Sequence, residues 1–415
     1  MRRVVVTGLG PVSSIGIGLA PFREALRAGR SGASPISSFD AAKFPRRLAA
    51  EVRDFDPHAL LRQLDPDDWG RASLFAAAAA RLAMHDAGFS EGAPPSERTA
   101  VVIGTTSGES QVLEEMTRAL MAGGFGALSS KLMRRLPTHR LAEAAAEELG
   151  ARGEALTLTT ACSASNYALG YAYDLIASGE YDVVIAGGAD AVCCWAHAGF
   201  LRLGAIAESR CAPFDRDRDG ILVGEGGASL LLEAGDHAEA RGARPYAEML
   251  GYGLNCDAAH VTAPNAESIA ACMRMALANA AVAPSEIDWV CAHGTGTPTN
   301  DAVEAAAIRA VFGDAPPPMS SIKSMLGHTM GAASAFGAIA SVLSIKDGFL
   351  PPTINWRTPD SDLAGIDPIA NMARPAQPRH VQNNGFAFGG NNAIVVFGAM
   401  EASGATGRAG LAAEL

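Results

Sequence analysis

The stretch "LTLTTACSASNYALG", Leu156 to Gly170, decides the fold of this chain. A Thr-rich β-run ends at a lone cysteine, Cys162, and a helix of small residues follows. A helix N-terminus presents free N–H groups and a positive dipole end, which favour a thiolate and stabilise a carbonyl oxygen as it gains charge. The small residues Ser163, Ala164 and Ser165 leave room for a bulky substrate. The stretch alone fits a nucleophile and also fits a cysteine that only packs.

The composition is that of a large, acidic globular protein. The chain has 415 residues, 48% hydrophobic and 19% charged, which is enough for a large core and too apolar for disorder. A formal net charge of -11 argues against nucleic acid and anionic membranes as main partners, since both require clustered positive charge. The seven cysteines form no CxxC pair, so neither disulfides nor structural zinc are expected. There is no signal peptide and no long apolar run, and we expect a cytoplasmic protein without a membrane span.

Short β-branched runs alternate with Ala-rich helical runs along the chain. Buried strands are predicted for "RVVVTG", "TAVVIGT", "YDVVIAGGA", "WVCAHGT" and "AIVVFG". The helical runs between them include "SLFAAAAARLAMHDAG" and "SIAACMRMALANAAV". This alternation is typical of an α/β protein.

Two pairs of segments resemble each other. The segments that begin at Arg81 and Arg274 both run from a helix through a Pro-Ser-Glu turn to a strand and Gly-Thr. The Cys162 stretch and "PMSSIKSMLGHTMGAA", Pro318 to Ala333, both lead a Ser/Thr-rich strand into a small-residue helix. We therefore expect one body of two related α/β halves, because each half would need the other to bury a face.

Two histidines follow predicted strands. His293 lies in "CAHGTGTPTND", where a strand ends, and ligands of α/β sheets bind at that end. Thr295 and Thr297 in the same loop can hydrogen-bond a polar substrate arm. His328 lies in "SIKSMLGHTMGAA" with Lys323 five residues before it. Each histidine, taken alone, fits a structural role as well as a catalytic one.

The glycine-rich stretches do not indicate a nucleotide site. "VVVTGLGPVSSIG" lacks the G-x-G-x-x-G spacing, and there is no P-loop lysine. "NNGFAFGGNNAIVV", Asn383 to Val396, is a turn before the last strand that either supplies a backbone N–H to a site or only connects two elements.

Seven blocks together carry a family resemblance. In chain order they are "RRVVVTGLG", "TTACSASN", "VVIAGGAD", "APFDRDRDGILVGEGGA", "AHGTGTPTNDAVE", "SIKSMLGHTMGAA" and "NGFAFGGNN". In these blocks the chain resembles the elongating β-ketoacyl-[acyl carrier protein] synthases of the thiolase-fold superfamily over residues 1–398. The resemblance implies a duplicated five-layer α/β/α/β/α fold and a dimer. It places the nucleophile half at 1–250, the histidine half at 251–400 and a flexible tail at 401–415.

The resemblance also implies a chemistry. Cys162 would accept an acyl chain from a carrier-protein thioester, and His293 and His328 would stabilise the enolate formed when malonyl-carrier protein loses carbon dioxide. The backbone N–H groups of Cys162 and Phe388 would form the oxyanion hole, with Phe388 gating the acyl pocket. Substrate contacts are expected at Thr295, Thr297, Gly389 and Gly390. No cofactor or metal is implied, since the substrates arrive on the phosphopantetheine of the carrier.

Three departures from the family pattern stand out. Ala387 replaces the usual glycine beside Phe388, which removes backbone freedom at the gate. Gly337 stands where the family has the glutamate partner of Lys323, which leaves pairing of Lys323 with Asp301 or Glu304 as the alternative.

The floor of the acyl pocket is the third departure. It falls at Ser107, with Glu109 nearby, where apolar residues are usual. A small polar floor suits something other than a plain saturated chain, and in these departures the chain resembles the ketosynthases of secondary pathways such as aryl-polyene biosynthesis.

The carrier partner requires a local basic patch, because carrier proteins are acidic and this chain is acidic too. The candidates are Lys131, Arg134, Arg135 and Arg202. The dimer partner would be a second copy or a chain-length-factor homologue. The alternatives to a condensing enzyme are a pocket-shaping subunit of the chain-length-factor type, disfavoured by the intact Cys162, and a thiolase, disfavoured by the missing second cysteine.

Overall fold

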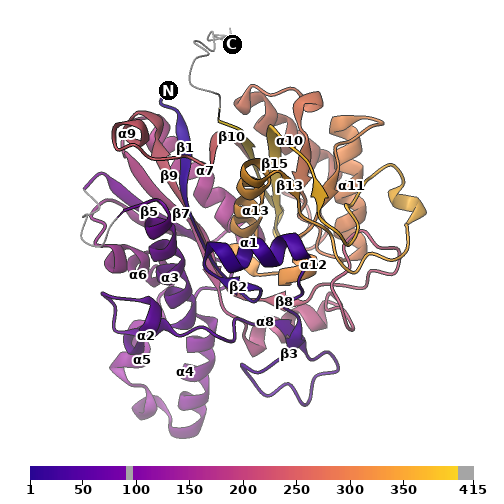
Figure 1. Cartoon of the computed structure of the whole chain (residues 1–415). Helices are drawn as coiled ribbons and strands as arrows, with labels where there is room; N and C mark the ends of the chain where they lie inside the picture. The colour runs from indigo at the N-terminus through magenta and orange to yellow at the C-terminus, as the bar shows by residue number, and fades with distance from the viewer. Residues whose placement is uncertain (90–96, 401–415) are drawn as a thin grey trace.

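One 11-stranded β-sheet runs through the protein, which we describe for residues 1–89 and 97–400 from a computed structural model (Figure 1). The predicted tail at 401–415, and residues 90–96 of the first repeat segment, lie outside the described residues. The N-terminal half of the chain forms the left of Figure 1 and the C-terminal half forms the right.

The two halves contribute five main strands each. In the N-terminal half these lie in the spatial order β6-β5-β7-β9-β1. Their bounds are β1 (Val4–Ser13), β5 (Thr99–Gly104), β6 (Ala155–Leu158), β7 (Val183–Asp190) and β9 (Gly226–Ala234). In the C-terminal half the order is β12-β11-β15-β16-β10. Their bounds are β10 (Ala247–Cys256), β11 (Trp289–Cys291), β12 (Met319–Ser320), β15 (His380–Phe386) and β16 (Asn391–Gly398).

The two sets of strands have one topology. Numbered along the chain within each half, both sets follow the order 3-2-4-5-1. In each half the second strand is parallel to the third and fourth, and the fifth strand is antiparallel to its neighbours. Antiparallel pairing of β1 with β10, where Val4 faces Met249, joins the halves in the middle. The predicted duplication is therefore confirmed.

Two helices of small residues lie between the halves. They are α7 (Ala164–Ala177) and α13 (Ala333–Asp347). Their chains approach closely enough for Ser165 Oγ and Ser334 Oγ to share a hydrogen bond of 2.8 Å. The side chain of Asn166 on α7 reaches across to the carbonyls of Asn383 and Ala393, on β15 and β16. Alanine, glycine and serine allow this approach because longer side chains would hold the helices apart.

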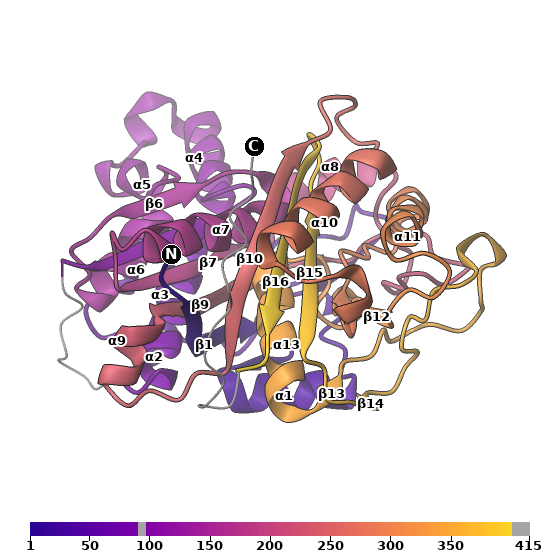
Figure 2. The ribbon, with the colours of Figure 1, turned by 90° about the horizontal axis from the view of Figure 1, so that it is seen from above.

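Further helices cover the two outer faces. On the N-terminal half these are α3 (Arg71–Asp86) and α6 (Arg140–Leu149), and on the C-terminal half α10 (Ala266–Ala280) and α11 (Pro298–Phe312). Seen from above in Figure 2, α10 and α11 lie on the opposite side of the β10, β16 and β15 strands from α3 and α6. With α7 and α13 in the centre, the layers are α/β/α/β/α, as the predicted fold class requires.

Smaller elements frame this body. They are α1 (Leu19–Ala28), α2 (Pro57–Leu60), α4 (Ser110–Gly123), α5 (Ser130–Arg135), α8 (Cys194–Arg202), α9 (Gly235–Ala240), α12 (Lys323–Leu326), β2 (Gly16–Ile17), β3 (Ser34–Pro35), β4 (Leu48–Ala50), β8 (Val223–Gly224), β13 (Phe349–Leu350) and β14 (Arg374–Pro375). Helices α4 and α5 project from the N-terminal half as a lobe (Figure 1). Across residues 1–89 and 97–400, no helix has the length and apolar character needed to cross a membrane.

Candidate active site

Cys162 lies in a short 3-10 turn, Ala161–Ser163, between β6 and α7. The turn begins with Ala161 at a φ of 50°, a left-handed conformation that is costly for a residue with a side chain. This kink turns the chain from strand into helix and brings Cys162 to the wall of a cavity, where it is buried. The predicted strand, turn and helix around the thiol are all present.

The electrostatic environment of Cys162 differs from the simple helix-terminus expectation. Burial raises the pKa of the Cys162 thiol to about 11. The charge of Lys323 and the backbone N–H groups of Phe388 and of Cys162 itself act in the opposite direction but do not outweigh burial. The thiol is therefore protonated at rest, and its proton must leave when the sulfur attacks. The two N–H groups that act on the sulfur are those expected to form the oxyanion hole.

His293 follows β11 and is held by its neighbours in one protonation form. The backbone N–H of Phe386 donates to His293 Nδ1 at 3.3 Å, so Nδ1 is an acceptor and the proton of the neutral ring is on Nε2. The backbone N–H groups of His293 and Gly294 donate to the Glu304 carboxylate at 2.8 and 2.7 Å, which fixes the loop. Burial, Lys323 and His328 hold the pKa of His293 well below its usual value.

His328 is held in the same way by a different element. The backbone N–H of Met330 donates to His328 Nδ1 at 3.1 Å, so this ring also carries its proton on Nε2. Burial and the Lys323 charge lower the pKa of His328 to about 3. The two rings lie with their centroids 5.7 Å apart and their planes at 84°. Both imidazoles are therefore neutral Nε2–H donors at physiological pH.

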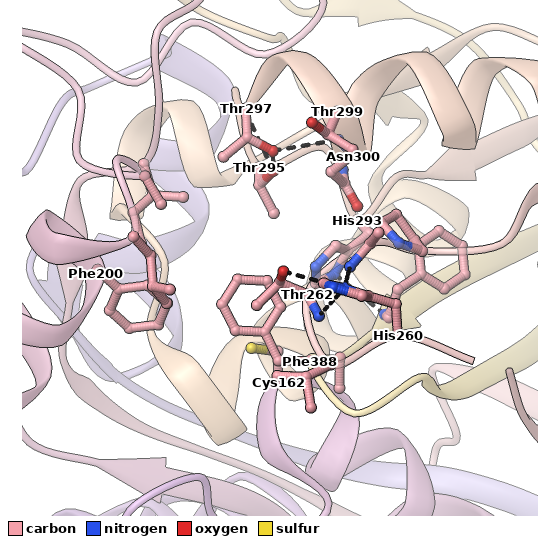
Figure 3. A pocket seen from close by; sticks show the side chains of 18 of the residues that line it. Cys162, Phe200, His260, Thr262, His293, Thr295, Thr297, Thr299, Asn300 and Phe388 are labelled. Carbon is pink, nitrogen blue, oxygen red and sulfur yellow. Dashed lines mark hydrogen bonds between the residues drawn. The ribbon is translucent and has the colours of Figure 1, made fainter. Parts of the chain in front are cut away.

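One cavity of about 230 Å³ brings these groups together, since Cys162, His293 and His328 all line it. Figure 3 shows the Cys162 sulfur beneath Phe388, with Thr295 and Thr297 on the opposite side of the cavity. The two threonine hydroxyls share a hydrogen bond of 2.9 Å. Three residues spread over 166 positions of the chain, from Cys162 to His328, thus line one cavity.

The turn between β15 and β16 forms the gate side of the cavity. Phe388 is 38% exposed, and its ring centroid lies 6.0 Å from that of Phe200 on α8. Gly389 and Gly390 have φ values of 88° and 84°, which glycine adopts without strain. Ala387, the departure from the family pattern, precedes this pair and is not among the described non-glycine residues with positive φ. The turn therefore accommodates Ala387 in this conformation.

Lys323 is buried and points at the backbone of the loop that carries His293. Its Nζ donates to the His293 carbonyl at 2.6 Å. Among the described residues no ion pair within 4 Å joins Lys323 to Asp301 or Glu304, because both carboxylates accept backbone N–H groups instead. Burial lowers the pKa of Lys323, and its charge in turn lowers the pKa of both histidines and of Cys162.

Other predicted site residues lie elsewhere. Ser107 does not line the cavity, and its backbone N–H donates to Asp190 Oδ1 at 3.0 Å. Glu109 is buried and accepts from the backbone and hydroxyl of Ser73. The role of Ser107 as pocket floor stays a prediction.

The four basic docking candidates separate into two places. Lys131, Arg134 and Arg135 are on α5 in the projecting lobe, where Lys131 pairs with Asp68 at 3.4 Å and Arg135 with Glu115 at 3.3 Å. Arg202 ends α8, between the cavity residues Phe200 and Leu203.

Sequence reasoning missed the loop that follows β10. Residues Asp257 and His260 to Pro264 line the cavity, and Gly389 donates to the Val261 carbonyl at 2.8 Å, so the loop is tied to the gate turn. His260 Nδ1 accepts the backbone N–H groups of Thr262 and Ala263, both at 3.1 Å, which holds the loop in shape (Figure 3). The strand before this loop, β10, is not among the strands predicted from the sequence, so the stretch "DAAHVTAP" is not recognised there as following a strand end, although it contains Asp257 and His260.

Comparisons with known proteins agree with this geometry. Residues 1–238 match the family model for the beta-ketoacyl synthase N-terminal domain, and residues 246–357 match the model for the C-terminal domain. The chain is 37% identical over 95% of its length to the 3-oxoacyl-[acyl-carrier-protein] synthase 2 of Coxiella burnetii, of which it covers 98%.

Two solved structures are also similar over nearly the whole chain. One is entitled "The ishigamide ketosynthase/chain length factor", with 50% identity, a TM-score of 0.94, and coverage of 96% of this chain and 100% of that chain. The other is a ketosynthase in complex with its type II acyl-carrier protein, bound to the hexaketide, with 31% identity, a TM-score of 0.89 and the same coverage.

Proposed function

The chain belongs to the beta-ketoacyl synthase family, and from this membership we propose that Cys162, His293 and His328 perform a decarboxylative Claisen condensation between an acyl thioester and malonyl-carrier protein. The single observation that carries these roles is the shared protonation form of the two histidines. Backbone N–H groups occupy both Nδ1 atoms, so both Nε2–H groups are left for the cavity that contains the thiol.

The first half-reaction loads the enzyme. The Cys162 sulfur attacks the carbonyl carbon of an acyl-carrier thioester, and the carbonyl oxygen gains charge beside the N–H groups of Cys162 and Phe388. The bond to the carrier sulfur then breaks, and the proton of the Cys162 thiol is transferred to the departing thiolate. The protons of this half-reaction balance, because the one proton that the Cys162 thiol gives up is the one that the carrier thiol takes up.

The second half-reaction forms the new carbon–carbon bond. The malonyl thioester oxygen accepts hydrogen bonds from His293 Nε2–H and His328 Nε2–H, and the carboxylate carbon leaves as carbon dioxide. The electron pair of the broken bond remains on the enolate, which attacks the acyl carbon on Cys162. The Cys162 sulfur leaves as a thiolate and takes one proton from water, which restores the thiol. Neutral donors suit this step because an imidazolium would protonate the carbanion before it attacks.

The substrates in this reaction are carried by a phosphopantetheine arm, and no cofactor or metal takes part. Thr295 and Thr297, whose hydroxyls face the cavity, hold the polar arm, while Gly389 and Gly390 let the gate turn approach it. The carrier docks at the cavity mouth, where Arg202 is exposed. Arg202→Glu is expected to raise the carrier KM at least tenfold, whereas Arg379→Glu, an exposed arginine at the opposite end of β15 from Phe388, is the matched control.

The structure supports a partner chain beside β6. Among the described residues this strand is one of the two edge strands of the sheet, with β12 at the other end, so it has one unpaired side. Large apolar side chains are exposed on the neighbouring α4–α5 lobe and α8: Met121 and Phe125 at 84% and 85%, and Trp195 at 64%. We assign this surface to a chain-length-factor homologue, because the relative at 50% identity is a ketosynthase/chain length factor. Light scattering after expression alone and together with such a chain tests the assignment, and a stable active homodimer would overturn it.

The acyl substrate is proposed to be conjugated rather than saturated. Aromatic rings of Phe200, Phe386 and Phe388 line the cavity, and flat conjugated chains pack well against such rings. A conjugated substrate of this kind would belong to a polyene-forming secondary pathway. The proposal is abandoned if saturated chains of C8 to C14 are extended as readily as polyene chains of the same length.

The decisive experiment offers a panel of acyl-carrier thioesters with malonyl-carrier protein and identifies products by mass spectrometry. We expect an acyl adduct on Cys162 and a product longer by two carbons. A chain that only shapes the pocket of another synthase gives neither, and the intact Cys162 in the cavity argues against that role. Cys256, which is exposed, is the matched control thiol that should carry no acyl group.

A further inference from the structure

A buried carboxylate at the end of β7 joins the two halves of the molecule. Asp190 is 1% exposed and accepts four hydrogen bonds. Three come from the loop after β5: Thr105 Oγ1 at 2.8 Å, the Thr106 N–H at 2.8 Å and the Ser107 N–H at 3.0 Å. The fourth comes from the other half, where the Gly331 N–H donates to Asp190 Oδ2 at 2.7 Å. Each oxygen of the Asp190 carboxylate therefore accepts two hydrogen bonds, and all four donors belong to the protein.

The duplicated topology shows what Asp190 replaces. Thr99 pairs with Val183 on β7, and its counterpart Trp289 pairs with Val381 on β15. Asp190 lies seven residues after Val183, as Phe388 lies seven residues after Val381. The carboxylate in the N-terminal half therefore corresponds to the gate phenylalanine in the C-terminal half.

The turn before each central helix is duplicated as well. Ala161 and Met330 begin the turns with φ values of 50° and 54°, and the next residues are Cys162 and Gly331. The Gly331 N–H is thus the counterpart of the Cys162 N–H. The Gly331 N–H donates to an oxygen of Asp190, whereas in the proposed reaction the Cys162 N–H donates to a substrate oxygen.

A short covalent path leads from this contact to the reaction. Gly331 is bonded to Met330, whose N–H donates to His328 Nδ1 and leaves the ring proton on Nε2. Met330 is kept in a left-handed conformation that is costly for methionine, so a fixed neighbour is needed to maintain it. We propose that Asp190 is a positioning residue for His328, holding the Met330–Gly331 turn so that the His328 Nε2–H faces the malonyl oxygen.

Removing the charge of Asp190 should act on the two half-reactions in opposite directions. The carboxylate is one of the groups that raise the pKa of Cys162, so its loss does not slow attack by the sulfur. An amide in place of the carboxylate offers one acceptor oxygen and directs an NH₂ group at two of the four donors. The His328 contact is therefore weakened while the thiol stays reactive. A role that is only structural would reduce both.

The test compares Asp190→Asn with the full-length wild type in two assays, and it rests on the proposed function. The first assay is carbon dioxide release from malonyl-carrier protein. The second is alkylation of Cys162 by iodoacetamide, which needs neither carrier nor histidine. The matched control is Asp86→Asn, which removes a partly buried carboxylate that also accepts a backbone N–H, from Leu9 at 2.9 Å, but lies outside the cavity wall.

We expect Asp190→Asn to lose at least tenfold in decarboxylation with alkylation unchanged or faster, and Asp86→Asn to stay within threefold of wild type in both assays. Decarboxylation within threefold of wild type, or an equal loss in both assays, overturns the proposal. If Asp190→Asn does not fold, Thr105→Val removes one donor to the carboxylate and should lower decarboxylation about threefold at constant alkylation, and no change overturns the proposal. A wild type that releases no carbon dioxide instead refutes the proposed function.

Discussion

The two halves of this protein share one topology but carry different chemistry, and the difference is concentrated in a few positions. The β6–α7 connection carries Cys162, and the β12–α13 connection carries Gly331 at the equivalent place. His293 in the C-terminal half corresponds to Ile103 in the N-terminal half, one residue before the shared Gly-Thr pair. A duplicated scaffold can therefore host a single active site when one copy supplies the nucleophile and the other supplies the hydrogen-bond donors.

The second histidine arises from a difference in length. Val101 pairs with Ala155 and its counterpart Cys291 pairs with Ser320. Ala161 follows Ala155 by six residues, whereas Met330 follows Ser320 by ten. The extra residues in the C-terminal half allow the turn α12 and place His328 two residues before the left-handed Met330. The added turn thus provides a donor that the first half lacks.

The largest expected effect comes from the nucleophile that only one half carries. Cys162→Ala should abolish condensation, a loss of more than about a thousandfold, because no acyl-enzyme can form. Carbon dioxide release from malonyl-carrier protein should continue, since the histidines belong to the other half. Product mass and carbon dioxide are measured on the same sample. Loss of both activities together would contradict the division of labour between the halves.

A smaller effect is expected for the donors. His293→Ala should reduce decarboxylation by about a hundredfold to a thousandfold, the range for removing one donor to a developing oxyanion. Acylation of Cys162, followed by mass spectrometry, should be affected less. His197→Ala removes another buried histidine that does not line the cavity and serves as the control. An equal loss in the control would show that the effect comes from packing.

The two buried histidines of the C-terminal half should make the protein less stable at acidic pH. Folding lowers the pKa of His328 from 6.5 to about 3 and lowers that of His293 as well, so protons bind the unfolded chain more readily. Above pH 6.5 the histidines are neutral in both the folded and the unfolded chain, and their titration does not change the free energy of unfolding. Below pH 6.5 the unfolded chain binds protons that the folded protein does not, so the free energy of unfolding falls by about 1.4 kcal/mol per pH unit for each histidine. Urea unfolding at pH 7 and pH 5 should show a smaller difference for the His293→Gln/His328→Gln variant. The same difference in wild type and variant would contradict the burial of these rings.

The smallest effect compares the two left-handed residues. Ala161→Gly should stabilise the protein by up to about 1 kcal/mol, because glycine adopts a positive φ without strain and the alanine methyl contributes little. Met330→Gly should instead destabilise it by about 2 to 4 kcal/mol, because the buried methionine side chain is lost. Urea unfolding measures both. A higher free energy of unfolding for Ala161→Gly and a lower one for Met330→Gly would show that the strain at Ala161 is not offset by its side chain. Destabilisation by both variants would show that the backbone strain at Ala161 is negligible.

Much of this arrangement could be predicted from the sequence. The β-branched strands, the small-residue helices and the paired segments predict the duplicated α/β fold, because periodicity and residue size report directly on burial. Cys162 and His293 follow predicted strands, but the roles of Cys162, His293 and His328 are predicted from the seven blocks shared with the family, because each residue alone also fits a structural role. Their convergence on one cavity could not be derived from spacing, since it depends on how α7 and α13 pack between the halves.

Other features depend on tertiary contacts with no local signature. The raised pKa of Cys162 follows from burial, which outweighs the N–H groups that the sequence pattern emphasises. The hydrogen bond from Lys323 to the His293 carbonyl replaces the ion pair that the family pattern implies. Asp190 is part of "VVIAGGAD", which predicts only the end of a strand, and its contact with Gly331 is visible only when both halves are in place.

The central claim is that two neutral imidazoles stabilise the enolate, and the pH dependence of carbon dioxide release by Cys162→Ala tests it most directly. Because the pKa of His328 is held at about 3, the rate per folded enzyme should be constant between pH 6.5 and pH 8.5. A rate that rises severalfold or more as the pH falls across this range would show that an imidazolium is the active form, and would contradict the account.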